Sequence, residues 1–151
     1  MNPPSQILKI TRQLRHGRAR VFSALTDPVK MSQWFFGLQG GQAKVTNELR
    51  PGGRYRIEMS NGQQTAIAQG SYLEIVPPER LVFSWQSCLD GSETRVTIEL
   101  MEAAGGTKLI LTHELREDQV PPHREGWNLC FDHLEHHLDG QPAPAAAKSV
   151  S

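Results

Sequence analysis

The sequence lacks several features that mark common classes of protein. Its 16 Lys and Arg residues balance its 16 Asp and Glu residues, so no net charge attracts nucleic acid or an anionic membrane surface. No apolar run approaches the roughly 20 residues of a membrane-spanning helix. The segment Met1 to Gln6 lacks the basic and then apolar layout of a signal peptide. We therefore expect a cytoplasmic protein with no membrane span and no nucleic-acid partner.

Motifs for metal and covalent chemistry are also missing. Cys88 and Cys130 are far apart and have no metal-site spacing, so we expect two buried, reduced thiols. No Gly-x-Ser-x-Gly motif marks a nucleophilic serine. Gly52 and Gly53 do not form a phosphate loop, because no helix and no Lys-Ser/Thr pair follow them. The sequence therefore predicts no metal and no cofactor, and it favours a protein without enzymatic activity while leaving that question open.

A long amphipathic stretch near the end, residues 122–138, is the strongest pattern in the chain. Trp127, Phe131, Leu134 and Leu138 follow the spacing of one helical face. A proline suits the first turn of such a helix, and a glycine suits its end. At ~1.5 Å per residue, the stretch forms a rod of roughly 25 Å. We therefore predict one helix long enough to cross a small domain.

Nearly everything before this helix shows the alternation of half-buried β-strands. The segments with this pattern are residues 8–14, 54–59, 66–76, 81–86, 94–102 and 107–114. Two short helical segments follow the first strand, and Pro28 separates them, with Thr26 or Asp27 available to cap the second. Short turns favour antiparallel pairing. The prediction is an α+β fold with a sheet of about seven antiparallel strands.

The chain length fits a single domain. We expect it to span residues 7–139, after an N-terminal arm at 1–6. Residues 140–151 have little to pack, and we expect them to be disordered. A twisted sheet cannot follow a straight helix along its whole length, so a cavity lined by apolar and aromatic groups is expected between them.

Short motifs in a fixed order over residues 8–138 point to a family. They are Ile10-Thr11-Arg12, Val21-Phe22-Ser23-Ala24-Leu25-Thr26-Asp27-Pro28, Gln33-Trp34, Leu49-Arg50-Pro51-Gly52-Gly53-Arg54-Tyr55, the run from Tyr72 to Trp85, Gly106-Thr107, Leu111-Thr112-His113-Glu114 and Gly126-Trp127. The chain thereby resembles the SRPBCC, or START-like, superfamily, in the branch named after the activator of the heat-shock-protein-90 ATPase. Two places depart from the family pattern: His16-Gly17 replaces a common Ala-Pro, and Trp34-Phe35 replaces paired tryptophans.

The resemblance implies a helix-grip fold, in which a curved antiparallel sheet wraps around the C-terminal helix and leaves a cavity. It also implies small hydrophobic ligands such as lipids, polyketides or aromatic compounds. Some members of the superfamily are cyclases or hydrolases. We therefore predict a protein that binds a small hydrophobic or aromatic molecule. The expected pocket residues are Trp34, Phe35, Tyr55, Ile57, Met59, Tyr72, Phe83, Trp85, Leu111, His113, His123, Trp127 and Phe131.

Two alternatives stay open at this point. A polyketide cyclase or hydrolase would use His113 or His123 as acid or base, although both can equally be structural histidines. A chaperone cofactor would need an exposed partner surface. A homodimer through the outer face of the sheet is a further open question.

Several polar side chains have two interpretations each. Arg12 has the parity of the apolar face, so it either pairs with a carboxylate at the strand end or borders the cavity. Glu74 shares the parity of Tyr72 and would either face the cavity, where it could pair with Arg12, or face solvent. His133, His136 and His137 suit a solvated helix C-terminus.

Overall fold

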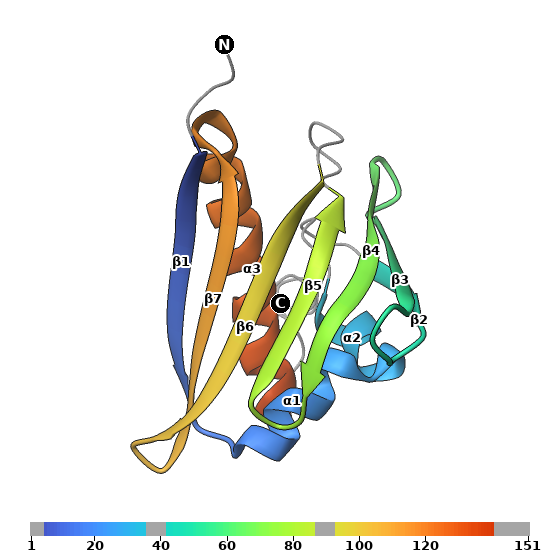
Figure 1. The fold of residues 1–151 in the computed structure, drawn as a ribbon. Helices are drawn as coiled ribbons and strands as arrows, with labels where there is room; N and C mark the ends of the chain where they lie inside the picture. The colour runs from blue at the N-terminus through green and yellow to red at the C-terminus, as the bar shows by residue number, and fades with distance from the viewer. Residues whose placement is uncertain (1–4, 36–41, 87–92, 141–151) are drawn as a thin grey trace.

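The computed structural model describes residues 5–35, 42–86 and 93–140. Its elements are β1 (Ser5–Leu14), α1 (Arg18–Thr26), α2 (Pro28–Trp34), β2 (Gln42–Asn47), β3 (Arg54–Ser60), β4 (Thr65–Val76), β5 (Arg80–Gln86), β6 (Glu93–Ala103), β7 (Gly106–Arg116), a 3-10 turn (Glu117–Gln119) and α3 (Val120–Leu138). Within these residues, seven antiparallel strands form one sheet in the order β1-β7-β6-β5-β4-β3-β2 (Figure 1). The predicted α+β architecture is confirmed.

The first and last strands of the chain lie side by side. β1 pairs antiparallel with β7 along its whole length, from Ser5 opposite Arg116 to Leu14 opposite Thr107. The chain then passes through α1 and α2 to β2, at the other edge of the sheet, and returns strand by strand to β7. The helix α3 lies against one face of the curved sheet, and α1 and α2 lie near the lower end of that face in Figure 1.

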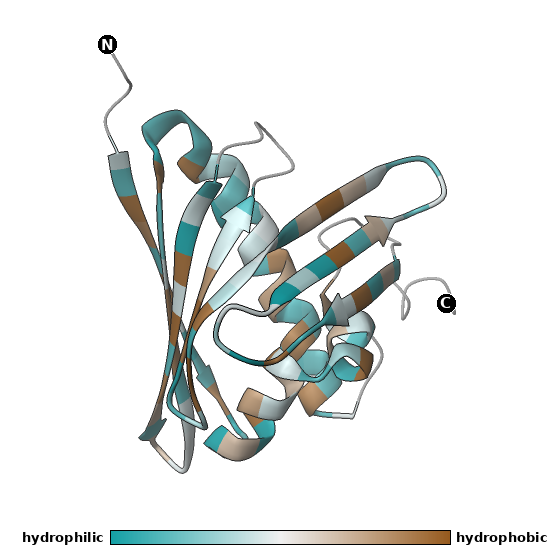
Figure 2. Ribbon diagram, turned by 45° about the vertical axis from the view of Figure 1, so that its right-hand side comes forward, coloured by the Kyte–Doolittle hydropathy of each residue, from teal (hydrophilic) through white to brown (hydrophobic). Residues whose placement is uncertain are grey.

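Alternating side chains along the strands build the inner face. Leu8 and Ile10 of β1 are buried, and so are Tyr55, Ile57 and Met59 of β3. Figure 2 shows the corresponding alternation of hydrophilic and hydrophobic residues along the strands. Because successive side chains point to opposite faces, this pattern places one apolar surface against α3. Most of the core lies between these two layers.

The terminal helix α3 carries the predicted apolar stripe. Trp127, Phe131, Leu134 and Leu138 are all at most 3% exposed. The helix begins at Val120, two residues before the predicted start, and its prolines lie in the first turn, where a missing N–H removes no helical hydrogen bond. None of the helices described over 5–35, 42–86 and 93–140 is long and apolar enough to cross a membrane.

The predicted helix cap at the start of α2 and the predicted turn before β3 are both present. The Asp27 carboxylate caps α2 by accepting hydrogen bonds from the Val29 and Lys30 amides. Gly52 has a φ of +82°, and the Gly53 amide donates to the Arg50 carbonyl over 2.8 Å. A type II turn requires this conformation, and glycine adopts it without steric cost.

The alternation in the sequence did not locate the second strand, β2. Its residues Ala43 and Val45 are only partly buried, because β2 forms the edge of the sheet. Residues 36–41 and 87–92 lie outside the described residues, and so does the tail after Gly140. β1 begins at Ser5, within the stretch expected to be an arm.

A bulge in β4 separates two residues that the sequence placed on one face. The register with β5 shifts between Tyr72, which is opposite Phe83, and Glu74, which is opposite Val82. An extra residue in a strand reverses the direction of the side chains after it. Tyr72 is therefore buried, whereas Glu74 faces solvent and pairs with Arg80 over 3.3 Å. The alternative in which Glu74 faces the cavity and pairs with Arg12 is wrong.

Candidate functional site

The core contains a small cavity between the sheet, α2 and α3. Its volume is about 20 Å³. Apolar and aromatic side chains from α1, α2, β3, β4, β5, β6 and α3 form its walls. They are Leu25, Met31, Trp34, Phe35, Tyr55, Ile57, Tyr72, Leu81, Phe83, Trp85, Ile98 and Trp127. A water molecule needs at least about 10–15 Å³, so the cavity has room for a single water molecule.

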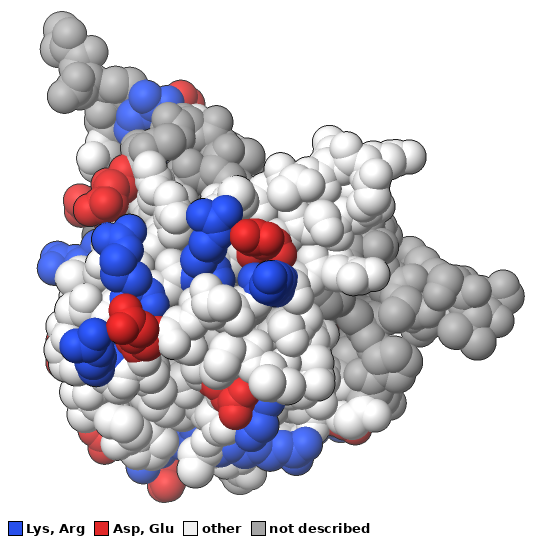
Figure 3. Space-filling view, turned by 90° about the vertical axis from the view of Figure 1, so that its right-hand side faces the viewer, with Lys and Arg blue, Asp and Glu red and all other residues white. Residues whose placement is uncertain are grey.

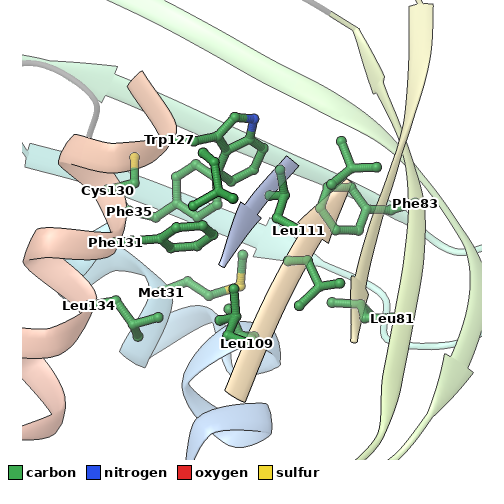
Figure 4. Packing of buried hydrophobic residues seen from close by; sticks show 14 of the residues in the cluster. Met31, Phe35, Leu81, Phe83, Leu109, Leu111, Trp127, Cys130, Phe131 and Leu134 are labelled. Carbon is green, nitrogen blue, oxygen red and sulfur yellow. The ribbon is translucent and has the colours of Figure 1, made fainter. Parts of the chain in front are cut away.

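Phe35 lies in the middle of an aromatic cluster at this cavity. Its ring centroid is 4.8 Å from that of Trp34, 6.1 Å from that of Trp85 and 5.6 Å from that of Trp127. Phe35 follows the last residue of α2, and it is 5% exposed. Figure 4 shows Phe35 beside Trp127 and Phe131, on the side of α3 that faces the sheet. Aromatic rings from α2, β5 and α3 therefore converge on one place.

Most polar atoms in the cavity wall have partners outside it. Trp34 Nε1 donates to the Ala24 carbonyl over 2.8 Å. The Tyr55 hydroxyl donates to the Ser84 carbonyl over 2.5 Å. Burial raises the pKa of the Tyr55 phenol, so this group stays neutral at physiological pH.

Tyr72 is held in a similar way. Its hydroxyl accepts a hydrogen bond from Asn47 Nδ2 over 2.9 Å, and the same amide nitrogen donates to the Thr26 carbonyl. Burial raises the pKa of the Tyr72 phenol, and the Asn47 hydrogen bond opposes this shift. Both tyrosines therefore present neutral rings to the cavity, while their hydroxyls bind the surrounding scaffold.

Trp85 is the exception among the described residues of the cavity wall. Its side chain lies on β5 between Phe35 and Trp127, and the residue is 7% exposed. The indole Nε1 is buried and has no hydrogen-bond partner. More than nine in ten buried polar groups in proteins have one, so this N–H is an unusual feature of the site.

His113 lies next to the cavity and is committed to a hydrogen-bond network. Its Nδ1 accepts from Trp127 Nε1 over 3.2 Å, because an indole nitrogen can only donate. Nε2 therefore carries the proton and donates to Thr94 Oγ1 over 2.6 Å. The Thr94 hydroxyl then donates to the Trp85 carbonyl over 3.2 Å. This tautomer follows from the network, and the network links α3 to three adjacent strands.

The environment of His113 keeps the ring neutral. Burial lowers the pKa of His113 to about 3, with a smaller contribution from the neighbouring His123. Both ring nitrogens are engaged, so His113 has the properties of a structural histidine. His123 contacts it edge to face, with ring centroids 5.3 Å apart, and donates from Nδ1 to the Gln119 carbonyl over 2.8 Å.

All thirteen predicted pocket residues are buried, and eight of them line the cavity. The eight are Trp34, Phe35, Tyr55, Ile57, Tyr72, Phe83, Trp85 and Trp127. Met59, Leu111, His113, His123 and Phe131 pack elsewhere in the core, and Phe131 stacks on Trp127 at 5.6 Å. The sequence analysis missed Leu25, Met31, Leu81 and Ile98 as wall residues. Their apolar periodicity was visible, but it does not distinguish a core residue from a cavity residue.

Arg12 pairs with carboxylates of α3 rather than bordering the cavity. Its Nη1 lies 2.9 Å from Asp132 Oδ1 and 3.0 Å from Glu135 Oε2. Nη2 donates to both the carbonyl and the side-chain oxygen of Asn128. The Arg12 side chain is 19% exposed, so its charge is largely removed from water and is compensated by these four contacts.

The expected exposure of the C-terminal histidines is wrong for His133, which is 1% exposed. It lies near Cys130 and His137 on one side of α3. Desolvation lowers the pKa of His137, and so do the charges of Lys30 on α2 and Arg20 on α1. The short helices therefore cover this side of α3, which a single apolar stripe does not reveal.

Cys130 and possible metal ligands are the remaining candidates for chemistry among the described residues. Cys130 is buried as a free thiol, as predicted, and burial raises its pKa to about 12. Cys88 lies outside the described residues. Within the part of the chain that the structure describes, no group of three or more His, Cys, Asp and Glu side chains could hold a metal ion.

The chain is similar to several proteins of known structure. A protein from Chromobacterium violaceum is 29% identical, with a TM-score of 0.75 over 86% of this chain and 95% of that chain. A protein from Rhizobium leguminosarum is 25% identical, with a TM-score of 0.78 over 93% and 98% of the two chains. An AHSA1-like protein from Aeromonas hydrophila is 20% identical and has a TM-score of 0.78 over 89% and 93%, which is a likeness of fold alone.

No curated protein matches the chain. A family model does match it, over residues 15–139. This range runs from the end of β1 to the end of α3, so it includes the whole cavity wall and every strand except β1. The resemblance seen in the sequence motifs is thereby confirmed, and the chain belongs to the family of Activator of Hsp90 ATPase homolog 1-like proteins.

Proposed function

We propose that the protein binds a small hydrophobic or aromatic molecule between the sheet and α3. The fold of this family supports ligand binding in general. The observation that carries the proposal is an apolar, aromatic cavity in which Trp85 Nε1 has no partner among the described residues. A core built for stability alone rarely keeps such a donor, because its desolvation is not compensated.

The size of the cavity sets a condition on this function. A cavity of about 150 Å³ holds benzene, whereas the space here is about 20 Å³. A ligand must therefore displace a side chain. Phe35 is the best candidate, because it lies at the end of α2 and its ring fills the centre of the aromatic cluster. In this proposal the Phe35 ring occupies the place that the ligand takes.

Two experiments test the proposal. Native mass spectrometry of freshly purified protein would reveal a molecule carried from the cell. Thermal-shift screening would then cover lipids, polyketides, flavonoids and small aromatic compounds. A ligand present at a hundred times its dissociation constant should stabilise the folded protein by about 2.7 kcal/mol.

Variants of Phe35 connect these measurements to the cavity. We expect Phe35→Leu, which removes part of the ring volume, to bind small aromatic compounds more tightly than wild type. Phe131→Leu is the matched control, because Phe131 is fully buried but does not line the cavity. The absence of any bound or stabilising compound for both wild type and Phe35→Leu would overturn the proposed function.

The enzymatic alternative has less support. Both ring nitrogens of His113 are engaged, and its pKa of about 3 keeps it from acting as a base near neutral pH. His123 is 6% exposed and donates to a backbone carbonyl. The hydroxyl nearest to His113 in its network, that of Thr94, donates to the Trp85 carbonyl.

A chaperone-cofactor role, which the family name suggests, lacks a matching surface among the described residues. The large exposed apolar side chains are spread over separate parts of the chain, as Ile7 on β1, Val29 on α2, Leu73 on β4 and Met101 on β6 illustrate. On the face shown in Figure 3, basic and acidic side chains lie next to one another. That face therefore offers no field of one sign to a partner.

A further inference from the structure

The polar groups of the cavity wall restrict the chemistry of its occupant. The Trp34 and Trp127 indole nitrogens donate to Ala24 and His113, and the Tyr55 hydroxyl donates to Ser84. Among the described wall residues, only Trp85 has a buried side-chain nitrogen or oxygen without a partner. One described wall residue, Trp85, thus carries an unused hydrogen-bond donor, and the other described wall side chains offer none.

A water molecule does not fit this environment well. The volume of about 20 Å³ would admit one. However, buried waters are retained by two to four hydrogen bonds. The lining provides one unused donor, Trp85 Nε1, so a water molecule here would lose most of the hydrogen bonds that it makes in bulk solvent. An apolar molecule with a single acceptor loses fewer, because that acceptor can pair with Trp85 Nε1 and the rest of the molecule needs no hydrogen bond.

A charged occupant fits still less well. No Lys, Arg, Asp, Glu or His side chain is among the described residues that line the cavity. His113, whose ring contacts those of Trp85 and Trp127, is neutral and has both nitrogens engaged. An ion moved from water into such an environment loses its hydration and gains no counter-charge, which strongly opposes binding.

We infer that the ligand of this cavity is an uncharged, largely aromatic molecule with one hydrogen-bond acceptor, such as a ketone oxygen, that pairs with Trp85 Nε1. This inference rests on the proposed binding function and adds a ligand class to it. Trp34 and Trp127 provide the aromatic contacts in the place that the Phe35 ring vacates, and the Trp85 N–H determines the orientation. The same site should reject carboxylates of equal size.

Matched small molecules test the acceptor. Acetophenone and α-methylstyrene have the same shape, but a C=CH2 group replaces the carbonyl in the second compound. Benzoate has a similar size and carries a negative charge. With wild type and Phe35→Leu, we expect acetophenone to bind about fivefold more tightly than α-methylstyrene, the ratio that one net hydrogen bond supplies. Benzoate should bind more weakly than either.

The indole N–H signals of the 15N-labelled protein provide a second readout that needs no variant of the pocket tryptophans. The chain has three tryptophans, which give three such signals. In the free protein, the Trp85 proton should resonate upfield of those of Trp34 and Trp127, because only theirs are hydrogen-bonded. Acetophenone should move the Trp85 signal downfield, and α-methylstyrene should not.

Trp85→Phe removes the donor and should abolish the preference for acetophenone. Trp34→Phe is the matched control, since Trp34 also lines the cavity but its N–H donates to Ala24. The control should retain the fivefold ratio, whatever its absolute affinity. The ratio within each variant is the measured quantity, so a general loss of affinity does not disturb the comparison.

The outcomes separate this inference from the proposed function. Equal binding of acetophenone and α-methylstyrene, with an unmoved Trp85 signal, would overturn the inference and leave the binding function intact. A magnetisation transfer from water to the Trp85 N–H in the free protein would also overturn it, since a bound water would then be the partner. Benzoate binding as tightly as acetophenone would refute the uncharged ligand class. Binding of none of the three compounds would overturn the inference, and the proposed function would fall with it only if the wider screen also yields no bound or stabilising compound.

Discussion

Two polar contacts hold α3 against the sheet, and they are built in opposite ways. Arg12 of β1 forms an ionic contact with Asp132 and Glu135, whose side chains are 52% and 38% exposed. His113 of β7 forms a neutral contact with Trp127, and both residues are almost completely buried. The ionic contact lies at the water-accessible edge of the sheet, and the neutral contact lies beside the cavity.

The difference shows how the protein combines a firmly held helix with an apolar site. A charge beside the cavity would attract water and favour charged molecules, whereas the neutral imidazole fixes Trp127 without doing so. The charged residues that also hold α3 are kept at the edge, where solvent stabilises them. Three experiments test this comparison.

The largest effect is expected for His113→Ala. The change removes the acceptor of Trp127 Nε1 and the donor to Thr94 Oγ1, and it creates a void in the core. The free energy of unfolding should fall by about 3 kcal/mol, measured by urea denaturation at pH 7. His136→Ala serves as the control, because His136 is only partly buried and should change stability little. A similar loss in both variants would mean that the buried network has no special role.

The pH dependence of stability should be the next largest effect. His113 has a pKa of about 3 in the folded protein and an ordinary value of 6.5. Between these values the unfolded chain binds a proton that the folded protein does not. The free energy of unfolding should therefore decrease as the pH falls below 6.5, by up to about 1.4 kcal/mol per pH unit from this residue.

His113→Gln isolates this contribution, because glutamine does not titrate. The stability difference between wild type and this variant should shrink steadily when urea denaturation is repeated from pH 7 to pH 4. A difference that stays constant over this range would show that His113 is protonated in the folded state as readily as in the unfolded state.

The smallest effect is expected for Arg12→Met, which keeps most of the apolar stem and removes the charge. Because its partners are partly exposed, stability should decrease by about 1–2 kcal/mol at low salt. The loss should be smaller in 1 M NaCl, where the screening length is about 3 Å, whereas the effect of His113→Ala should not change. Arg15→Met is the control, since the Arg15 side chain is 85% exposed. A loss for Arg12→Met that is independent of salt would contradict an ionic contact at this edge.

Much of the fold was predictable because periodicity directly reflects burial. The stripe of Trp127, Phe131, Leu134 and Leu138 identified α3, and Pro28 separated the two short helices correctly. The alternation along the strands marked the inner face of the sheet. These patterns are local, and each depends on only one buried face.

The predictions for His133 and Glu74 were wrong because each depends on more than the pattern of its own segment. His133 is buried because the short helices cover another side of α3. Glu74 faces solvent because a bulge reverses the parity after Tyr72. The unpartnered Trp85 N–H and the small volume of the cavity depend on how side chains from seven elements pack together. No pattern within a single segment contains that information.

The pairing of β1 with β7 has a consequence for synthesis on the ribosome. The hydrogen bonds between β1 and β7 join Ser5–Leu14 to Thr107–Arg116, so they can form only after Thr107–Arg116 have been made. At about 5–20 residues per second, the intervening chain takes roughly 5–20 s to be translated. During this time Leu8 and Ile10 have no β7 to pair with and no α3 to pack on, because both elements come after β6 in the chain. The sheet therefore gains β1 only after β7 has been made, and until then the nascent chain carries an unpaired, aggregation-prone segment.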